Sequence, residues 1–270
     1  MVPSSRLLKI EVFDVVPSTN DTILEAGENG LPEGTTHIAR SQTGGRGRGG
    51  HTWWSPPGAG LWMSTLLRPA RHQRFWGGIS LLAGKAVQMA LEELGIPRVD
   101  LYWPNDLKVG RRKIGGILGE ARSHGRAWLA LGIGVNIDFS AEELRKAMPA
   151  EILGLATSMV ECGKPATTDP ESIARVILKE FWPLYDAFER GEELPAVIGT
   201  RLGHIGREVE IRIAGSLPWR GEVEGIGAEG ELLVRAGQAL PDPPPGGSWI
   251  EREQERVAVR AGEVVYLERG

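Results

Sequence analysis

The chain has 270 residues, enough for one large domain or for one medium and one small domain. Its 41% hydrophobic and 24% charged residues are typical of a globular protein. With 31 basic and 35 acidic residues its net charge is −4, which argues against bulk binding of nucleic acid. No apolar run approaches the roughly 20 residues of a membrane span. A lone cysteine, Cys162, excludes an internal disulfide, so we expect a cytoplasmic protein without membrane contact.

Short apolar segments of β type recur through the first 198 residues. They predict strands at residues 10–16, 36–42, 61–66, 99–103, 113–118 and 127–137. Between the first two, Ser18 or Thr19 is placed to cap a helix that contains the apolar residues Ile23 and Leu24. The segment 99–103 and the segment 113–118 are separated by a predicted turn.

Two longer helices are expected farther along the chain. Residues 79–94 have apolar positions at helical spacing and end at a Gly-Ile-Pro stop. The next helix begins with Pro170 at its first position, runs towards Gly191 and is expected to kink at Pro183. Strands and helices in this arrangement predict the α/β (α+β) class, a mixed β-sheet with helices packed on it.

The pattern changes after residue 198. Short strands separated by glycine turns are predicted at residues 209–213, 221–226, 231–234, 255–259 and 263–267. The proline-rich stretch 240–248 is expected to be a surface turn, since proline cannot pair in a sheet interior. We therefore divide the chain into an α/β unit, residues 1–198, and a small β-barrel, residues 199–270.

A glycine- and arginine-rich loop at residues 42–64 is the most informative segment. It reads QTGGRGRGGHTWWSPPGAGLWMS. Its glycines let the backbone approach a ligand closely, while Arg46 and Arg48 offer charged forks for phosphate or carboxylate. Trp53 and Trp54 can cover an apolar ligand body. Anion contacts beside an apolar wall predict a substrate that has both parts.

Other interpretations of this loop are weaker. Its glycine spacing matches the dinucleotide-binding fingerprint, but that fingerprint needs a helix directly afterwards, and Ser-Pro-Pro-Gly at residues 55–58 prevents one. A P-loop needs a final Gly-Lys-Ser/Thr, which the run lacks. An RGG segment for single-stranded nucleic acid is usually repeated, whereas this one is single. A purely structural loop stays open, although it gives the two arginines no role.

Three further segments carry side chains suited to a ligand. Residues 18–20 (STN) lie at a helix start, where they can bind a polar head group or serve only as an N-cap. The YWPND run at 102–106 could be a mere hairpin turn, but it is followed by RKIGGIL at 112–118, which places a lysine beside two glycines. In GIGVN, Asn136 interrupts an apolar strand and needs partners if it is buried, either a polar network or a ligand.

These four segments together resemble the motifs of the biotin protein ligases. The family's GRGRxGRxWxSPxG appears as GRGRGGHTWWSPPG at residues 45–58, and its KWPND and GIGxN motifs appear as YWPND and GIGVN. RKIGGIL matches the family's lysine motif. Order and spacing agree over nearly the whole chain, and the small C-terminal barrel matches the family's SH3-like last domain.

The resemblance implies a two-step reaction with ATP. The biotin carboxylate attacks the α-phosphate of ATP, which gives biotinyl-5′-adenylate and pyrophosphate, and a lysine amine of a biotin carboxyl carrier domain then displaces AMP. The carrier would belong to acetyl-CoA carboxylase or a related carboxylase. Mg²⁺ is expected to screen the phosphate charge. Because water destroys the adenylate, residues 43–51 are expected to order over it.

The family's functional residues carry over onto matching positions. Fixed positive charge must bring carboxylate and triphosphate together, and the catalytic residues are expected to be Lys113, Arg46 and Arg48. Biotin contacts are expected at Ser18, Thr19, Asn20, Gln42, Arg46, Gly47, Arg48, Trp53, Lys113, Gly115 and Gly116. ATP contacts are expected at Arg48, Trp53, Asn105, Asp106 and Asn136. The sequence does not identify which residues would bind the Mg²⁺ ion.

Three positions depart from the family pattern. His51 replaces the last arginine of the loop, Gly49 is often basic in relatives, and Tyr102 replaces a lysine. Weaker retention of the adenylate and one cation fewer on the nucleotide side are the expected results. The chain starts at the catalytic unit, which predicts a monofunctional ligase that binds no DNA and is not a repressor. The family also allows a homodimer.

Three competing functions remain. A lipoate or octanoate ligase or transferase of the same superfamily is the nearest, but those enzymes lack the GRGRGG run. A nucleic-acid-binding module would use the RGG-like loop and the barrel, against the acidic balance of the chain. An inactive homologue would explain His51 and Tyr102 as marks of lost function.

Overall fold

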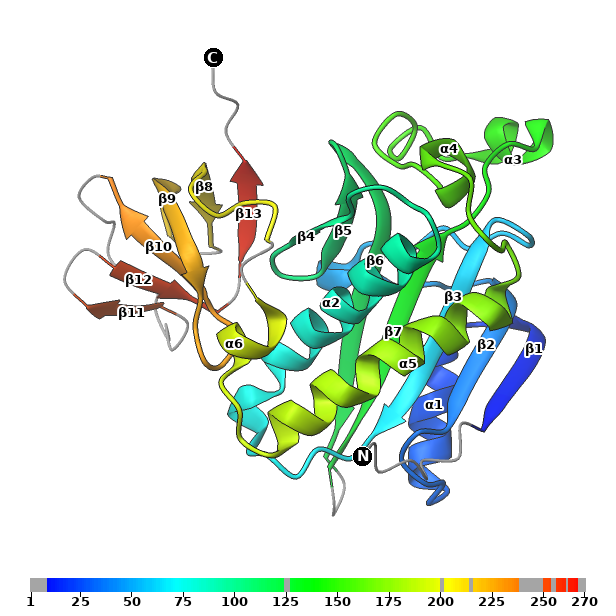
Figure 1. Ribbon diagram of the computed structural model, residues 1–270, viewed down its shortest axis with the longest axis horizontal. Helices are drawn as coiled ribbons and strands as arrows, with labels where there is room; N and C mark the ends of the chain where they lie inside the picture. The colour runs from blue at the N-terminus through cyan, green and yellow to red at the C-terminus, as the bar shows by residue number, and fades with distance from the viewer. Residues whose placement is uncertain are drawn as a thin grey trace.

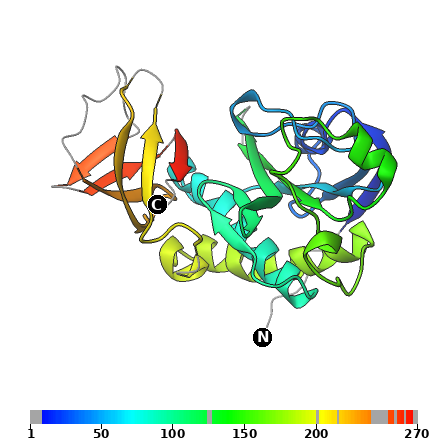
Figure 2. The ribbon, with the colours of Figure 1, turned by 90° about the horizontal axis from the view of Figure 1, so that it is seen from above.

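A computed structural model of the chain shows two β-sheets and the helices that pack on the first of them (Figure 1). The part of the chain that it describes comprises residues 9–123, 127–199, 202–213, 216–237, 250–253, 256–260 and 262–266. Seen from above, the sheet formed by the C-terminal residues lies at one side of the larger unit (Figure 2). The fold class predicted from the sequence is confirmed.

The first sheet has seven strands in the order β1-β2-β3-β7-β6-β5-β4. Only β1 and β2 are parallel, and the other neighbours pair antiparallel. The strands are β1 (Ile10–Val16), β2 (Thr36–Gln42), β3 (Gly60–Leu67), β4 (Asp100–Tyr102), β5 (Asp106–Val109), β6 (Arg112–Arg122) and β7 (Trp128–Asn136). The predicted turn before residue 113 was incomplete, because Asp106 begins a strand of its own.

Three helices cover the first sheet at the places the sequence predicts. They are α1 (Thr19–Glu28), α2 (Gly77–Glu93) and α5 (Pro170–Glu189), and Pro183 lies inside α5, which continues through it. The short helices η1 (Arg48–Gly50), η2 (Gln73–Phe75), α3 (Glu142–Ala147), α4 (Met159–Cys162) and α6 (Leu194–Ile198) were not predicted. Cys162, the last residue of α4, is half-buried. Within the described residues, no helix has the length and apolar character of a membrane span.

The helices lie on opposite faces of the sheet. Leu66 and Trp128 pack with Ile23 of α1, whereas Leu67 and Leu129, one residue farther along the same strands, belong to the core beneath α2 and α5. Successive strand residues point to opposite faces, so this alternation sets the two layers. Ser18 accepts a hydrogen bond from the Asn20 N–H and begins α1 at the sheet's centre, beside the glycine loop.

The C-terminal unit is a six-stranded antiparallel sheet in the order β11-β12-β10-β9-β8-β13. Its strands are β8 (Glu208–Arg212), β9 (Trp219–Ile226), β10 (Leu232–Ala236), β11 (Ile250–Glu253), β12 (Arg256–Val259) and β13 (Glu263–Tyr266). The predicted turn at 240–248 lies outside the described residues. The apolar side chains of this unit join the core of the first one, and the division at residue 198, where α6 ends, stays a prediction.

The two units meet at strand β4, directly before the WPN run. Leu101 and Leu202 form a parallel bridge, and the Trp103 indole N–H donates to the Gly230 carbonyl at 2.8 Å. The Trp103 backbone N–H donates to Nδ1 of His204 at 3.4 Å, and the His204 ring lies 5.8 Å from the Tyr102 ring. His204 is fully buried. The C-terminal unit therefore supports this motif from outside the first sheet.

Acid should weaken this junction. Burial lowers the pKa of His204 to about 3, and the charges of Arg207 and Lys108 act in the same direction, whereas the ordinary value is 6.5. At pH values between these two pKa values, the unfolded state binds more protons than the folded state. The contribution of neutral His204 to the free energy of unfolding is therefore fully present above pH 6.5 and is lost as the pH falls towards the pKa of the folded state. We expect a loss on the order of 3 kcal/mol by about pH 4. Urea unfolding at several pH values measures it.

The matched variant is His204→Gln, which removes the titrating group. It should be less stable than the wild type near neutral pH but should lose less stability on acidification. An equal loss in both proteins would show that other groups carry the pH dependence.

Candidate functional site

A cavity of about 770 Å³ lies between the glycine loop and the middle of the first sheet. Most of the predicted site residues line it: Ser18, Thr19, Asn20, Gln42, Arg46, Gly47, Arg48, Trp53, Asn105, Asp106, Lys113 and Gly116. Two predicted residues, Gly115 and Asn136, are not part of this lining. A Cβ at Gly115 would meet the Gly134 carbonyl and Leu107. Asn136 is buried and donates to the carbonyls of Lys113 and Thr157, at 3.2 and 2.9 Å.

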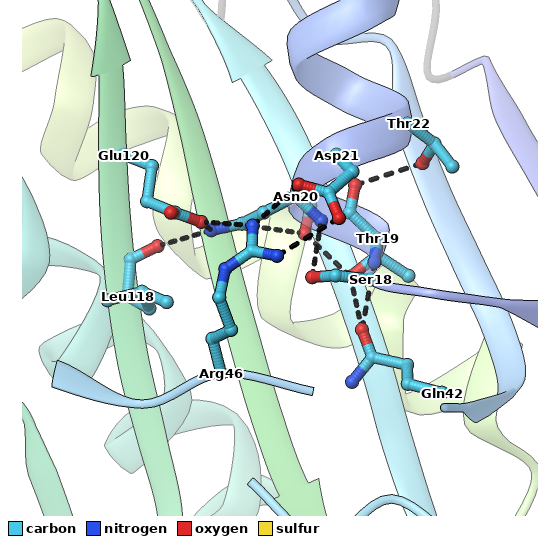
Figure 3. A network of polar contacts seen from close by, with 10 residues as sticks. Ser18, Thr19, Asn20, Asp21, Thr22, Gln42, Arg46, Leu118 and Glu120 are labelled. Carbon is cyan, nitrogen blue, oxygen red and sulfur yellow. Dashed lines mark hydrogen bonds and ion pairs between the residues drawn. The ribbon is translucent and has the colours of Figure 1, made fainter. Parts of the chain in front are cut away.

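Polar side chains from α1, β2 and β3 form one hydrogen-bonded network at one end of the cavity (Figure 3). The N–H and the hydroxyl of Thr19 donate to Oε1 of Gln42, at 2.8 and 3.2 Å. The Gln42 amide donates to Ser55 Oγ at 2.9 Å. Ser64 Oγ lies 2.7 Å from Thr19 Oγ1 and 2.6 Å from Asn20 Oδ1. This end of the cavity is held in a fixed arrangement that suits a compact polar group.

Arg46 lies beside this network, and its guanidinium binds two carboxylates (Figure 3). Nη1 and Nη2 donate to the two oxygens of Asp21, at 3.0 and 2.7 Å, and Nη2 also donates to Glu120 at 3.0 Å. The hydrogen bonds to Asp21 are the main cause that raises the pKa of Arg46 above its ordinary value, and Glu120 adds to them. Its charge is thus compensated by residues of the protein.

Trp53 fills the middle of the cavity wall against the sheet. A Cβ at Gly134 would lie 2.7 Å from Trp53 Cε2, and one at Gly116 would lie 3.0 Å from Trp53 Cζ3. Gly116 and Gly134 face each other across β6 and β7. Trp62 packs edge-on against Trp53, with 6.3 Å between ring centroids. Gly116 of the RKIGGIL motif and Gly134 of the GIGVN motif therefore leave room for the indole of Trp53, which forms the apolar middle of the cavity.

Three cations gather at the other end. Nζ of Lys113 lies 2.5 Å from the Asp106 carboxylate and 5.1 Å from the centre of the Trp53 ring. Arg48 forms no ion pair with any residue in the described ranges, and burial lowers its pKa while Asp106 opposes that change. Burial also lowers the pKa of Lys108, which lines the same cavity. These three cationic side chains make this end of the cavity suitable for binding an anion.

The departures from the family motifs find physical explanations here. Nζ of Lys108 lies 4.7 Å from the centre of the Tyr102 ring, so this side of the cavity keeps a cation, supplied by β5. That Tyr102 leaves one cation fewer on the nucleotide side than in the family motif stays a prediction. Gly49 and Gly50 have φ angles of 63° and 81°, a conformation that favours glycine, and His51 lines the cavity beside them.

Several lining residues were not predicted. They are Gly49, His51, Thr52, Trp62, Met63, Lys108, Ile117, Leu118, Gly132, Ile133, Gly134, Gly262 and Val264, together with Tyr102, Trp103 and Pro104 of the YWPND motif. The alternation of strands β6 and β7 could have found Leu118, Gly132 and Gly134, which share a sheet face with Gly116, but not Ile117 and Ile133 of the core face. Gly262 and Val264 come from the C-terminal unit, and no local pattern connects them with the glycine loop.

Comparisons with known proteins agree with this geometry. The Biotin/lipoate A/B protein ligase family matches residues 12–138. The chain is 32% identical over 232 residues to the bifunctional ligase/repressor BirA of Bacillus subtilis. The aligned part is 84% of this chain and 69% of BirA. It is 31% identical to the biotin–[acetyl-CoA-carboxylase] ligase of Paracoccus denitrificans, and the aligned part is 81% of this chain and 90% of that ligase.

The solved structures include a similar one. The biotin protein ligase of Aquifex aeolicus, in complex with biotin and ATP, superposes with a TM-score of 0.75 at 25% identity and covers 97% of this chain and 99% of that chain. The fold, the cavity and these matches define a ligase of the biotin/lipoate class. The chain belongs to the biotin protein ligases of the Biotin/lipoate A/B protein ligase family.

Replacing Gly134 tests the packing of Trp53. The methyl group of Gly134→Ala would overlap the indole, and overpacking typically costs about 1–3 kcal/mol. We expect destabilisation of that size in chemical unfolding. The matched control is Gly119→Ala on the neighbouring strand, whose Cβ would lie 3.4 Å from Leu129, an ordinary contact. Equal stability of the two variants would show that the indole moves without cost.

Proposed function

We propose that this chain joins biotin to ATP, forming biotinyl-5′-AMP and pyrophosphate, and then transfers the biotinyl group to a carrier lysine. The observation that carries this proposal is the order of surfaces in one cavity. A neutral polar network, an apolar indole wall and a cationic end follow one another. Biotin has the same order, namely a ureido ring, an apolar body and a carboxylate, and its carboxylate must meet a triphosphate.

The polar network positions the ureido end. The side chains of Thr19 and Gln42 bond each other, and Ser18 caps α1 and lines the cavity. Because these partners hold their rotamers, little side-chain freedom is lost when the ligand binds. Trp53 then aligns the apolar body along β6 and β7. This arrangement fixes the carboxylate at the cationic end.

The cationic end supports the first step. As a carboxylate oxygen attacks the α-phosphorus and pyrophosphate leaves, negative charge grows on the phosphate oxygens. Lys113, Lys108 and Arg48 line the place where this charge develops. Fixed donors in a partly desolvated site stabilise such charge without reorganising. In the second step a neutral lysine amine attacks the acyl carbon, AMP leaves, and the amine's proton passes to solvent.

Mg²⁺ fits this scheme as an ion that the nucleotide carries. Within the described residues, no three His, Cys, Asp or Glu side chains are grouped to hold a metal. Mg²⁺ commonly binds through substrate phosphates and one or two carboxylates, and Asp106 is the carboxylate at the cationic end. When bound, the ion supplies screening of phosphate charge.

The remaining assignments rest on the relatives. A carrier domain of acetyl-CoA carboxylase or a related carboxylase is the proposed acceptor, in keeping with the name of the Paracoccus denitrificans relative. We also propose a cytoplasmic enzyme that binds no DNA. A homodimer stays a family expectation.

A label-transfer assay tests the function directly. Labelled biotin, Mg-ATP and a carrier domain with one acceptor lysine should give a labelled carrier, and biotin should trigger pyrophosphate release before the carrier is added. Lipoate serves as the competing substrate. Pyrophosphate release with lipoate alone would assign the chain to the lipoate branch, and no release with either acid would mark an inactive homologue.

Removing the ammonium of Lys113 should slow adenylate formation strongly. We expect Lys113→Ala to lower the rate of biotin-dependent pyrophosphate release by about 10²–10³, the range for losing one preorganised donor. Lys179→Ala is the control, because Lys179 is an exposed lysine paired with Glu93 on the far helix layer. An unchanged rate of pyrophosphate release in Lys113→Ala would contradict the role of Lys113 in adenylate formation.

Lys108 should matter for the nucleotide. Lys108→Met is expected to raise KM for ATP by about tenfold and to leave biotin affinity unchanged, since a charge-assisted contact to phosphate is lost. Adding Tyr102→Lys to this variant should restore part of the loss, because both side chains line the same side of the cavity. Equal KM values for ATP in wild type and Lys108→Met would contradict the role.

A further inference from the structure

Arg46 and its two acids form a cluster that the proposed reaction has not explained. We call Asp21, Arg46 and Glu120 the Arg46 clamp. Asp21 comes from the first turn of α1, Arg46 from the base of the glycine loop and Glu120 from β6. Figure 3 shows the guanidinium between the two carboxylates. Three segments that are distant in sequence thus meet at one side chain.

The geometry of the clamp differs from that of an ordinary surface ion pair. Arg46 makes a two-pronged contact with Asp21 and a third bond with Glu120, and the side chains are 36%, 45% and 28% exposed. The pair Arg40–Asp14 has one contact at 3.3 Å, with the side chains 70% and 92% exposed. Exposed single pairs contribute little, whereas two-pronged arginine contacts in a network are the exception.

The clamp also reaches the polar network. The same Glu120 oxygen that binds Arg46 accepts a 2.6 Å bond from the Asn20 amide, which also donates to the Leu118 carbonyl at 3.3 Å. This fixes the Asn20 amide with its oxygen towards Ser64. A movement of the loop at Arg46 would therefore disturb the residues at the polar end of the cavity.

The base of the loop is held by backbone contacts around Arg46. Arg46 forms an antiparallel bridge with Thr52, and the Gly47 N–H donates to the His51 carbonyl at 2.7 Å. Residues 46–52 are thus a closed turn whose base is tied to α1 and β6 through one guanidinium. Arg48 lies inside this turn, lines the cavity and has no ion pair in the described part of the chain.

We infer that Asp21 and Glu120 are positioning residues that hold Arg46 as the anchor of the glycine loop, and that Arg48 is the loop's contact for the anionic ligand. The two loop arginines, which the sequence presents as equals, then have different tasks. This inference rests on the proposed function for the nature of the ligand. It predicts that loosening the clamp lets the adenylate escape, while losing Arg48 weakens nucleotide binding.

The test compares Asp21→Asn and Glu120→Gln with Arg48→Ala, and uses Asp14→Asn as a control at the exposed ion pair. Escape of biotinyl-adenylate is followed after single-turnover formation, and KM for ATP is measured separately. We expect both clamp variants to release adenylate about tenfold faster with KM for ATP changed less than about twofold. Arg48→Ala should raise KM for ATP by about tenfold, because the loop then loses its charge-assisted contact to the anionic ligand. Arg46→Lys, which keeps the charge but loses the fork, should release adenylate faster than wild type.

Trypsin cleavage in the loop gives a readout that needs no ligase activity. Asp21→Asn and Glu120→Gln should be cut after Arg46 or Arg48 faster than wild type and Asp14→Asn, with or without ligand. Thermal unfolding checks that the variants are folded. A wild type that releases no pyrophosphate with biotin would count against the proposed function, while the cleavage rates would still decide on the clamp. Clamp variants that match Asp14→Asn in cleavage, or that change only KM for ATP, would overturn the inference.

Discussion

The site depends on the contact between the Trp53 indole and two facing glycines of the sheet. A side chain at Gly116 or Gly134 would occupy the space of the ring. With the ring in place, the glycine loop is fixed above the sheet, Lys113 has an aromatic face beside it, and the polar and cationic ends of the cavity are kept apart. One apolar contact thus sets the spacing on which two sets of polar contacts rely.

The division of charge follows from that spacing. At the polar end, two carboxylates compensate the charge of Arg46. The side chains of the network are therefore held in place without an uncompensated cation facing the ligand. At the other end, Lys113 shares Asp106 while Arg48 and Lys108 are partly desolvated, and burial lowers the pKa of both. Desolvation strengthens their attraction for an incoming anion. A ligand with one neutral and one anionic end is therefore oriented by the cavity itself.

Much of this architecture can be predicted from the sequence. Periodicity located the long helices and most strands, because their apolar faces are continuous. The glycine and tryptophan motifs located the cavity. The partners of Arg46 were beyond such patterns, since Glu120 lies 74 positions away and is read as an ordinary strand residue. Asn136 illustrates the same limit: its pattern required buried partners but did not say that they would be backbone carbonyls.

The support of strand β4 by the C-terminal unit has a consequence for the order of events during synthesis. His204 and Gly230 form hydrogen bonds with Trp103 although they follow it by 101 and 127 positions. Gly262 and Val264, which complete the cavity lining, are synthesised later still. A nascent chain that stops short of them would have the glycine loop, the indole and the cations but would lack one wall. The cavity wall therefore becomes complete only after residue 264 has been synthesised and has left the ribosome.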